Sequence, residues 1–378
     1  MAATKGLADA TSSLKQKPFS RIFDILMEPR IDFTRSPQTD PIAVYRYRDG
    51  LYAGDLVIAA LTEFDLFTWL TEYPSDLPTL CGELGITERP ADVMLTLFTA
   101  NGWLTRSSEG FYETTATARE HLARTSPWYL GPYYASLKER PVVRDFVNIL
   151  RTGKPANWGS YANEKEWSEA MLTEAFATQF TAAMDCRGRY LGLGLARAVD
   201  TSGLTRLLDI AGGSGIYACI LTAHHAQLSA TVFERAPVDQ IAHTMIAKRG
   251  YGDRVAVAAG DMFADPLPGG HDLHLFSNVL HDWDFDKVRT LLGKSFAALP
   301  PGGMLMIHDA HINAAKTGPL AVAEYSAVLM SVTEGKCYSV SELETLLRDA
   351  GFQELKFRET VADRSVITAR KPRQAAAT

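Results

Sequence analysis

The sequence has few cysteines and no long apolar run, and both absences limit what the protein can be. Four cysteines occur among 378 residues, and no two of them form a CxxC pair. This pattern predicts buried free thiols in a reducing compartment. No apolar stretch reaches the ~18 residues that a membrane helix needs. Residues 1–18 also lack the apolar segment of a signal peptide, so we expect a cytoplasmic protein.

An excess of one charge sign is also missing. The formal net charge is −6, and 46% of the residues are hydrophobic, as in ordinary soluble globular proteins. Neither half of the chain is basic, so no surface for nucleic-acid phosphates is indicated. We therefore expect neither a nucleic-acid nor a membrane partner. The length predicts two or three domains.

A glycine-rich turn is the most informative feature that is present. The short strand-like run Leu207-Leu208-Asp209-Ile210 is followed by Ala211 and Gly212-Gly213-Ser214-Gly215, and an apolar run begins at Ile216. A strand, a glycine turn and a helix in this order bring backbone N–H groups close to a ligand. Glu234 ends the next strand-like run, where an acid can accept both ribose hydroxyls. This pattern predicts a nucleoside-bearing ligand on a Rossmann-like sheet. The dinucleotide pattern GxGxxG is not met, because position 218 is alanine.

Further motifs follow the glycine turn in a fixed order. They are Gly260-Asp261-Met262-Phe263, the strand 274–280, His281-Asp282-Trp283-Asp284, and Pro300-Pro301-Gly302-Gly303 before the strand 304–309. This order resembles the class I S-adenosylmethionine-dependent methyltransferases. The HDWxD block and the segment 334–352 resemble the small-molecule O-methyltransferases that include plant caffeate and bacterial natural-product enzymes. The resemblance covers residues 45–370. It implies S-adenosyl-L-methionine as cofactor, with S-adenosyl-L-homocysteine as product, and a homodimer.

The N-terminal part has its own helical pattern. Helices are predicted over 79–85 and 87–101, and a hairpin over 103–106 and 111–114, which together make a winged helix. The helix 87–101 carries a single arginine, so packing and dimerisation are favoured over DNA binding. We expect an α/β fold with an arm over 1–40, a mostly helical winged-helix dimerisation domain over 41–190, and a Rossmann-like methyltransferase domain over 191–372.

The resemblance also assigns residues to the cofactor. It implies that Asp209 and the glycine turn hold the methionine end, that Glu234 holds the ribose, and that Asp261 and Met262 hold the adenine. Ser277 and Asn278 end a strand on the side where open α/β sheets bind ligands. The complete set of expected cofactor contacts is Asp209, Gly212, Gly213, Gly215, Glu234, Asp261, Met262, Phe263, Ser277 and Asn278.

The predicted chemistry depends on His281. A phenol with a pKa of about 10 is mostly neutral at pH 7, so methyl transfer to its oxygen needs a base, and an imidazole suits that role. We expect His281 to end a strand on the ligand side. By resemblance, Asp309 orients it, where the family more often has glutamate. A second orienting glutamate of the plant enzymes aligns with Cys337, which leaves His281 with one expected carboxylate partner.

The expected acceptor is an aromatic or polyketide-like small molecule with a hydroxyl group. The expected contacts to it are Phe180, Met184, Asp282, Trp283, His311, Tyr325, Met330 and Cys337. One alternative is C-methylation of an α-keto acid, assisted by a metal bound among His281, Asp282, His308, Asp309, His311 and Cys337. The interpretation that we favour has no metal: His308 points to the other face of the sheet, and His311 only lines the pocket. Two further alternatives are a DNA-binding winged-helix regulator and a cofactor binder that does not methylate.

Overall fold

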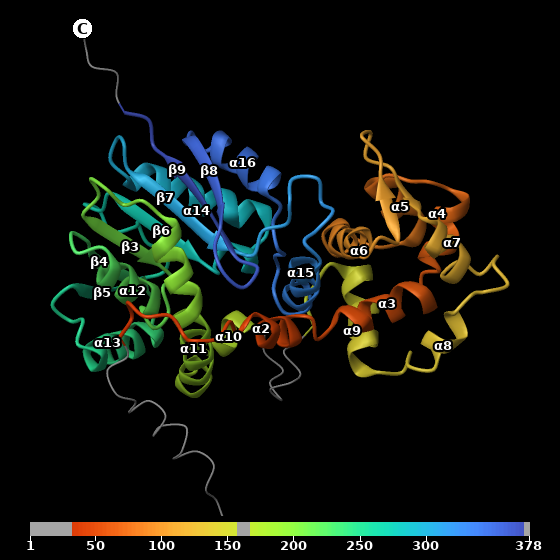
Figure 1. Cartoon of the computed structure of the whole chain (residues 1–378), viewed down its shortest axis with the longest axis horizontal. Coiled ribbons are helices and arrows are strands. Elements are labelled where there is room, and N and C mark those ends of the chain that lie inside the picture. The colour runs from red at the N-terminus through yellow and green to blue at the C-terminus, as the bar shows by residue number, and fades with distance from the viewer. Residues whose placement is uncertain (1–31, 157–166, 374–378) are drawn as a thin grey trace, which may run out of the picture. The chain divides into compact units, whose positions relative to one another are not determined.

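Apolar runs in the C-terminal part form a seven-stranded sheet with the order β5-β4-β3-β6-β7-β9-β8 (Figure 1). The computed structural model describes residues 32–156 and 167–373. Strands β3 to β7 run parallel, and β9 pairs antiparallel with both β7 and β8. The strands are β3 Arg206–Ile210, β4 Ser229–Glu234, β5 Val255–Ala259, β6 Leu273–Ser277, β7 Met304–Asp309, β8 Gln353–Glu359 and β9 Ser365–Arg370.

Successive residues of the central strands face opposite layers of helices. Leu207 and Leu275 belong to a core shared with α11, α12 and α13, whereas Leu208 and Phe276 belong to a core shared with α14 and α16. This alternation follows from the two-residue period of a strand. Because both faces are covered, the strands are apolar on both sides, as is usual in parallel sheets. The helices of this part are α11 Glu174–Ala198, α12 Ile216–His224, α13 Val238–Arg249, α14 Phe285–Ala298, α15 Leu320–Val332 and α16 Val340–Asp349.

The N-terminal part contains the expected helices and hairpin. Strands β1 Leu104–Arg106 and β2 Tyr112–Thr114 pair antiparallel directly after α6, which matches the winged-helix pattern. Thr87 stands at the N-cap of α6, but its hydroxyl donates to the carbonyl of Leu150 instead of capping the helix. The helices are α2 Ile42–Asp49, α3 Ala53–Thr62, α4 Leu66–Glu72, α5 Leu77–Leu84, α6 Glu88–Ala100, α7 Ala116–His121, α8 Gly131–Ala135, α9 Pro141–Thr152 and α10 Trp167–Ala170.

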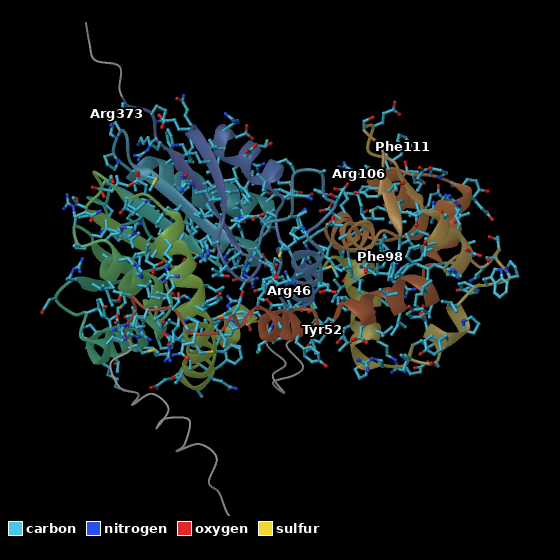
Figure 2. All side chains as sticks on the ribbon, in the orientation of Figure 1. Arg46, Tyr52, Phe98, Arg106, Phe111 and Arg373 are labelled. Atoms are coloured by element: carbon cyan, nitrogen blue, oxygen red, sulfur yellow. The ribbon has the colours of Figure 1, made fainter. Side chains whose placement is uncertain are left out.

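Helix α6, which would enter DNA in a winged-helix regulator, is covered by the rest of the chain. Residues 90–98 of α6 are all buried, and the helix packs against α15. Phe98 is fully buried, whereas Phe111 in the turn of the hairpin is 41% exposed (Figure 2). The apolar face of α6 therefore serves packing in this protein, which agrees with its single arginine.

The division into domains is not sharp along the chain. The predicted boundary between residues 190 and 191 lies inside α11, which continues without a break from Glu174 to Ala198. Residues 1–31 of the predicted arm lie outside the described residues. From Phe33 onward the chain forms one unit. None of the helices in the described ranges is long and apolar enough to span a bilayer.

Candidate active site

A cavity lies at the carboxyl ends of β3, β4 and β6, where the sequence places its glycine turn and acidic residues. Open α/β sheets bind ligands at this edge. The cavity brings together most of the predicted site residues, which come from α11, α15 and the turns that follow the strands. They are Phe180, Met184, Asp209, Gly212, Gly213, Glu234, Asp261, Met262, Phe263, Ser277, Asn278, His281, Asp282, Trp283 and Tyr325.

The glycine turn is open toward the cavity and anchored from behind. Gly213 has a φ of +57°, and a Cβ built on it would meet no atom within 4 Å, so this turn exposes its backbone. The hydroxyl of Ser214 donates to Asp185 of α11 at 2.6 Å, and Arg249 of α13 donates to the Ser214 carbonyl at 2.9 Å. Two helices therefore hold the turn in the conformation that faces the ligand.

Asp209 is a buried carboxylate without a partner. The side chain is fully buried at the end of β3, and neither of its oxygens has a hydrogen-bond partner in the described part of the chain. Burial raises its pKa to about 7, because a lone charge is poorly solvated there. An ammonium group of a ligand in the cavity would satisfy both oxygens. The α-ammonium group of S-adenosylmethionine has this chemistry.

The two other acidic residues of the cofactor prediction are already engaged in turns. Glu234 accepts a hydrogen bond from the N–H of Gly213 at 3.0 Å, and burial raises its pKa. Asp261 accepts from the backbone N–H of Phe263 through Oδ1 at 2.7 Å. Each still lines the cavity, so it can accept hydrogen bonds from a ribose or an adenine amine there. The unpartnered Asp209, the open turn at Gly213 and these two acids fit the cofactor that the sequence predicts.

The segment between β6 and α14 differs from the prediction. The strand ends at Ser277 and not at Leu280, because Asn278 adopts a left-handed conformation with φ of 54°. His281 therefore lies in a 3₁₀ turn, Leu280–Asp282, and does not end a strand as expected. The side-chain amide of Asn278 donates to the Tyr217 hydroxyl at 3.0 Å, and its Oδ1 atom is buried with no hydrogen-bond partner in the described residues.

His281 is held by Asp309 from the end of β7. The Nδ1 atom of His281 lies 2.5 Å from Oδ1 of Asp309, and both side chains are buried. Burial alone would lower the pKa of His281, but the carboxylates of Asp309 and Asp282 outweigh it and raise that pKa. Burial opposes ionisation of Asp309 too, yet the neighbouring His281 lowers its pKa to about 2. The remaining ring nitrogen, Nε2, is left to exchange a proton with a ligand, because His281 lines the cavity.

The expectation of a single carboxylate beside His281 is wrong. Asp282, its neighbour in the chain, lies 3.5 Å from Nε2 through Oδ1. Burial raises the pKa of Asp282 to about 6, so this second carboxylate gains a proton more readily than Asp309 does. The family resemblance implies a second acid at position 337, whereas in the structure the 3₁₀ turn supplies it from position 282.

Five predicted residues lie outside the cavity lining. Asp309 acts on the cavity only through His281. A Cβ on Gly215 would meet Ile246 at 2.7 Å, so Gly215 serves close packing of α12 on α13. His311 pairs with Ser365 at 2.7 Å, Met330 is fully buried in the core beside α6, and the backbone N–H of Cys337 donates to Ser326. His311, Met330 and Cys337 are therefore not placed to touch an acceptor in this cavity.

The cavity also has walls that the sequence analysis missed. Arg187 lies on α11 beyond Phe180 and Met184, and Val328, Leu329 and Val332 lie on α15 beyond Tyr325. The spacings i, i+4, i+7 and i, i+3, i+4, i+7 place each set on one helix face. Met330, five residues after Tyr325, falls on another face. The helical spacing from Phe180, Met184 and Tyr325, which were predicted from the sequence, would have identified these positions.

The histidines considered for a metal have other partners. His308 contacts the Ser277 hydroxyl through Nδ1 at 3.1 Å and the Thr360 hydroxyl through Nε2 at 3.2 Å. It projects from β7 away from its neighbour Asp309. In residues 32–156 and 167–373, no three histidine, cysteine or acidic side chains gather as metal ligands would. The donor set for metal-assisted C-methylation is therefore not assembled in the described part of the chain.

Comparison with known proteins identifies the family. Residues 145–353 match the profile of the O-methyltransferase domain family. The chain is 34% identical, over 81% of its own length and 88% of the relative's, to 3-hydroxy-5-methyl-1-naphthoate 3-O-methyltransferase from Streptomyces sahachiroi. It is 30% identical, over 85% and 94%, to the tetracenomycin polyketide synthesis 8-O-methyl transferase TcmO from Streptomyces glaucescens.

A solved structure agrees over nearly the whole chain. An O-methyltransferase family 2 protein from Planctomyces limnophilus, crystallised in complex with apigenin, superposes with a TM-score of 0.81 and 30% identity. The match covers 91% of this chain and all of that one. The resemblance inferred from the motifs is thereby confirmed. The chain belongs to the O-methyltransferase domain family and is an S-adenosylmethionine-dependent O-methyltransferase.

Proposed function

We propose that the protein methylates a hydroxyl group of an aromatic or polyketide-like small molecule, with His281 as the general base. The pair of His281 and Asp309, 2.5 Å apart beside the cavity, is the observation that carries this proposal. Bound S-adenosylmethionine supplies the methyl group from a sulfonium centre. The relatives named for a naphthoate and a tetracenomycin support a flat, hydroxylated acceptor.

Different residues carry out proton transfer, contact with the acceptor and binding of the cofactor. In the neutral imidazole, Asp309 accepts a hydrogen bond from Nδ1–H of His281. Nε2 then carries the lone pair and can take the acceptor's hydroxyl proton. Phe180, Met184 and Trp283 supply apolar walls for a flat ring. Asp209, the glycine turn, Glu234 and Asp261 hold the cofactor.

The test is incubation with methyl-labelled cofactor and a panel of phenols and α-keto acids. Mass spectrometry and NMR then locate the label in the product. We expect label on an oxygen of a phenol, and His281→Ala to lower turnover by about 10²- to 10⁴-fold. Label on carbon would favour the C-methylation alternative. An unchanged rate in His281→Ala, or no transfer to any compound while the cofactor binds, would contradict the proposal.

A homodimer in the cytoplasm is part of the same proposal. Trp128, Leu130, Tyr133 and Leu137 are large apolar side chains between 46% and 77% exposed within one short segment. Such a patch supports a protein partner, and a second copy is the partner that the family resemblance implies. All four thiols are unpaired, which supports a reducing compartment. Sedimentation of the wild type and of Trp128→Ser with Tyr133→Ser tests the dimer. A monomeric wild type at micromolar concentration contradicts it.

A further inference from the structure

Arg187 is a cation inside the cavity that has no carboxylate partner among the described residues. Its guanidinium has five N–H donors, and one of them, on Nη1, reaches the Tyr325 hydroxyl at 2.9 Å. Its Nε is buried and has no hydrogen-bond partner in residues 32–156 and 167–373. Most of the N–H donors of this side chain are therefore not used by that part of the chain.

Tyr325 adds a donor to the same place. Its ring is held on one side by Arg364, whose guanidinium carbon lies 4.5 Å from the ring centroid and which pairs with Asp49 at 3.0 Å. Because the Tyr325 oxygen accepts the hydrogen bond from Arg187, its own proton can be donated to a ligand. The rings of Tyr325 and His281 meet edge to face with centroids 5.9 Å apart. The donor group therefore lies beside the general base.

The acids around this position are already paired with other cations. Asp49 pairs with Arg364, and Asp309 pairs with His281. Asp282 lies against Nε2 of His281 at 3.5 Å. A partly buried cation without a counter-ion is costly, and a guanidinium matches a carboxylate with two parallel hydrogen bonds. The cavity thus presents hydrogen-bond donors and positive charge at a point where no carboxylate of the described residues lies within ion-pair distance of Arg187, although Asp49 acts on it at longer range.

We propose that Arg187 and Tyr325 bind a carboxylate carried by a ligand of this cavity. The position of Tyr325 next to His281 favours the acceptor as the source, so that the acceptor is an aromatic acid bearing the hydroxyl to be methylated. The methionine end of the cofactor carries the same group and is the other source. The assignment to the acceptor rests on the proposed function.

The first experiment compares a hydroxynaphthoic acid with the amide of the same substitution pattern. For the wild type we expect kcat/KM to favour the acid by about 10- to 100-fold, the range of a hydrogen bond to a charged group. Arg187→Gln loses this preference, because its kcat/KM falls more for the acid than for the amide. Arg187→Lys should keep part of the preference, because lysine keeps the positive charge but cannot make the two parallel hydrogen bonds of a guanidinium. An equal loss for acid and amide, or a wild type that does not distinguish them, overturns the assignment to the acceptor.

The second experiment distinguishes the two sources. Calorimetry measures binding of S-adenosylhomocysteine and of methylthioadenosine, which shares the nucleoside but has no amino-acid end. Equal affinities of Arg187→Gln and wild type for both compounds support the acceptor as the source. A selective loss for S-adenosylhomocysteine moves the carboxylate to the cofactor and overturns the acceptor assignment. If neither the acid preference nor this affinity changes, Arg187 binds no carboxylate.

Three controls separate this inference from effects on folding and on turnover. Arg197→Gln removes an exposed arginine from the same helix and should match the wild type in every assay. Tyr325→Phe removes one donor and leaves Arg187 in place, so it should weaken the acid preference even if Arg187→Gln unfolds. Calorimetry of the acid and the amide on S-adenosylhomocysteine-loaded protein reports on the carboxylate without methyl transfer. The inference can therefore hold or fail independently of the proposed reaction.

Discussion

His281 and Asp309 are 28 positions apart in the sequence, and their Nδ1 and Oδ1 atoms lie 2.5 Å apart in the fold. The adjacent parallel strands β6 and β7 bring them together, because the 3₁₀ turn after β6 and the last residue of β7 lie at the same sheet edge. The carboxylate both orients the imidazole and favours its protonated form.

The pH dependence of turnover should report this pair. His281 accepts a proton only when it is neutral, and its pKa is raised, so kcat should rise with pH through a midpoint above 6.5, the ordinary value. Asp309→Asn removes the main charge that raises the pKa, so the midpoint should move to lower pH. Its kcat should fall by about 10²-fold, because the ring loses its orientation. A pH–rate profile checks both effects, and an unchanged midpoint in Asp309→Asn would contradict the assignment.

Asp209 should couple cofactor binding to pH and stability. Its folded pKa of about 7 lies above the unfolded value of 3.8, so protonated Asp209 stabilises the fold and this contribution is lost as pH rises toward 7. Asp209→Asn should therefore raise the melting temperature of the ligand-free protein at pH 8 by a few degrees. It should also abolish the added stability from S-adenosylhomocysteine, because the ammonium loses its counter-ion. Thermal unfolding with and without the ligand measures both. A variant that S-adenosylhomocysteine still stabilises would be inconsistent with this role.

Gly335 should be intolerant of a side chain. A Cβ at this position would lie 2.2 Å from the carbonyl oxygen of His281 and 2.7 Å from that of Trp283. Gly335→Ala must therefore shift the turn that carries the base. A displacement of about 1 Å costs on the order of 10²-fold in rate. Single-turnover rates and calorimetry should show slow transfer with cofactor affinity nearly unchanged.

The control for Gly335→Ala is Gly293→Ala in α14, where a Cβ would meet nothing within 4 Å. This change should leave the rate unchanged and stabilise the exposed helix by about 0.5–1 kcal/mol. Equal rates for the two variants would show that the turn adjusts freely.

Arg89 should affect the reaction from the winged-helix region. It lies on α6 and donates to the carbonyls of Gly335 at 2.8 Å and Thr333 at 3.2 Å, in the loop that packs on the turn of His281. Arg89→Met leaves these buried carbonyls without donors, at about 1–3 kcal/mol each. We expect a lower melting temperature and a reduced kcat, with the KM for cofactor unchanged. Arg348→Met, at an exposed site on α16, is the matched control, and equal kinetics of the two variants would rule out this coupling.

Local sequence patterns were sufficient for much of this protein. The run 207–210 followed by Gly212 to Gly215 predicts the first strand, turn and helix, because glycine and apolar periodicity act through neighbouring residues. The order of Glu234, Asp261 and His281 places them at one sheet edge by the rules of parallel sheets. The hairpin after residue 101 was predicted in the same way.

Contacts between distant segments were decided by the tertiary structure. Asp282 approaches Nε2 of His281 because Asn278 ends β6 early. The sequence around Asn278 did not lead us to predict its left-handed backbone conformation. Met330 packs into the core because α15 turns its other face, with Tyr325 and Leu329, to the cavity. Cys337 lies in the loop after α15, where its N–H donates to Ser326. Among the described residues Arg187 has no carboxylate within ion-pair distance, because Asp49 pairs with Arg364, more than 300 positions away in the sequence. Charge pairing and helix rotation depend on which segments meet, so only the folded chain determines them.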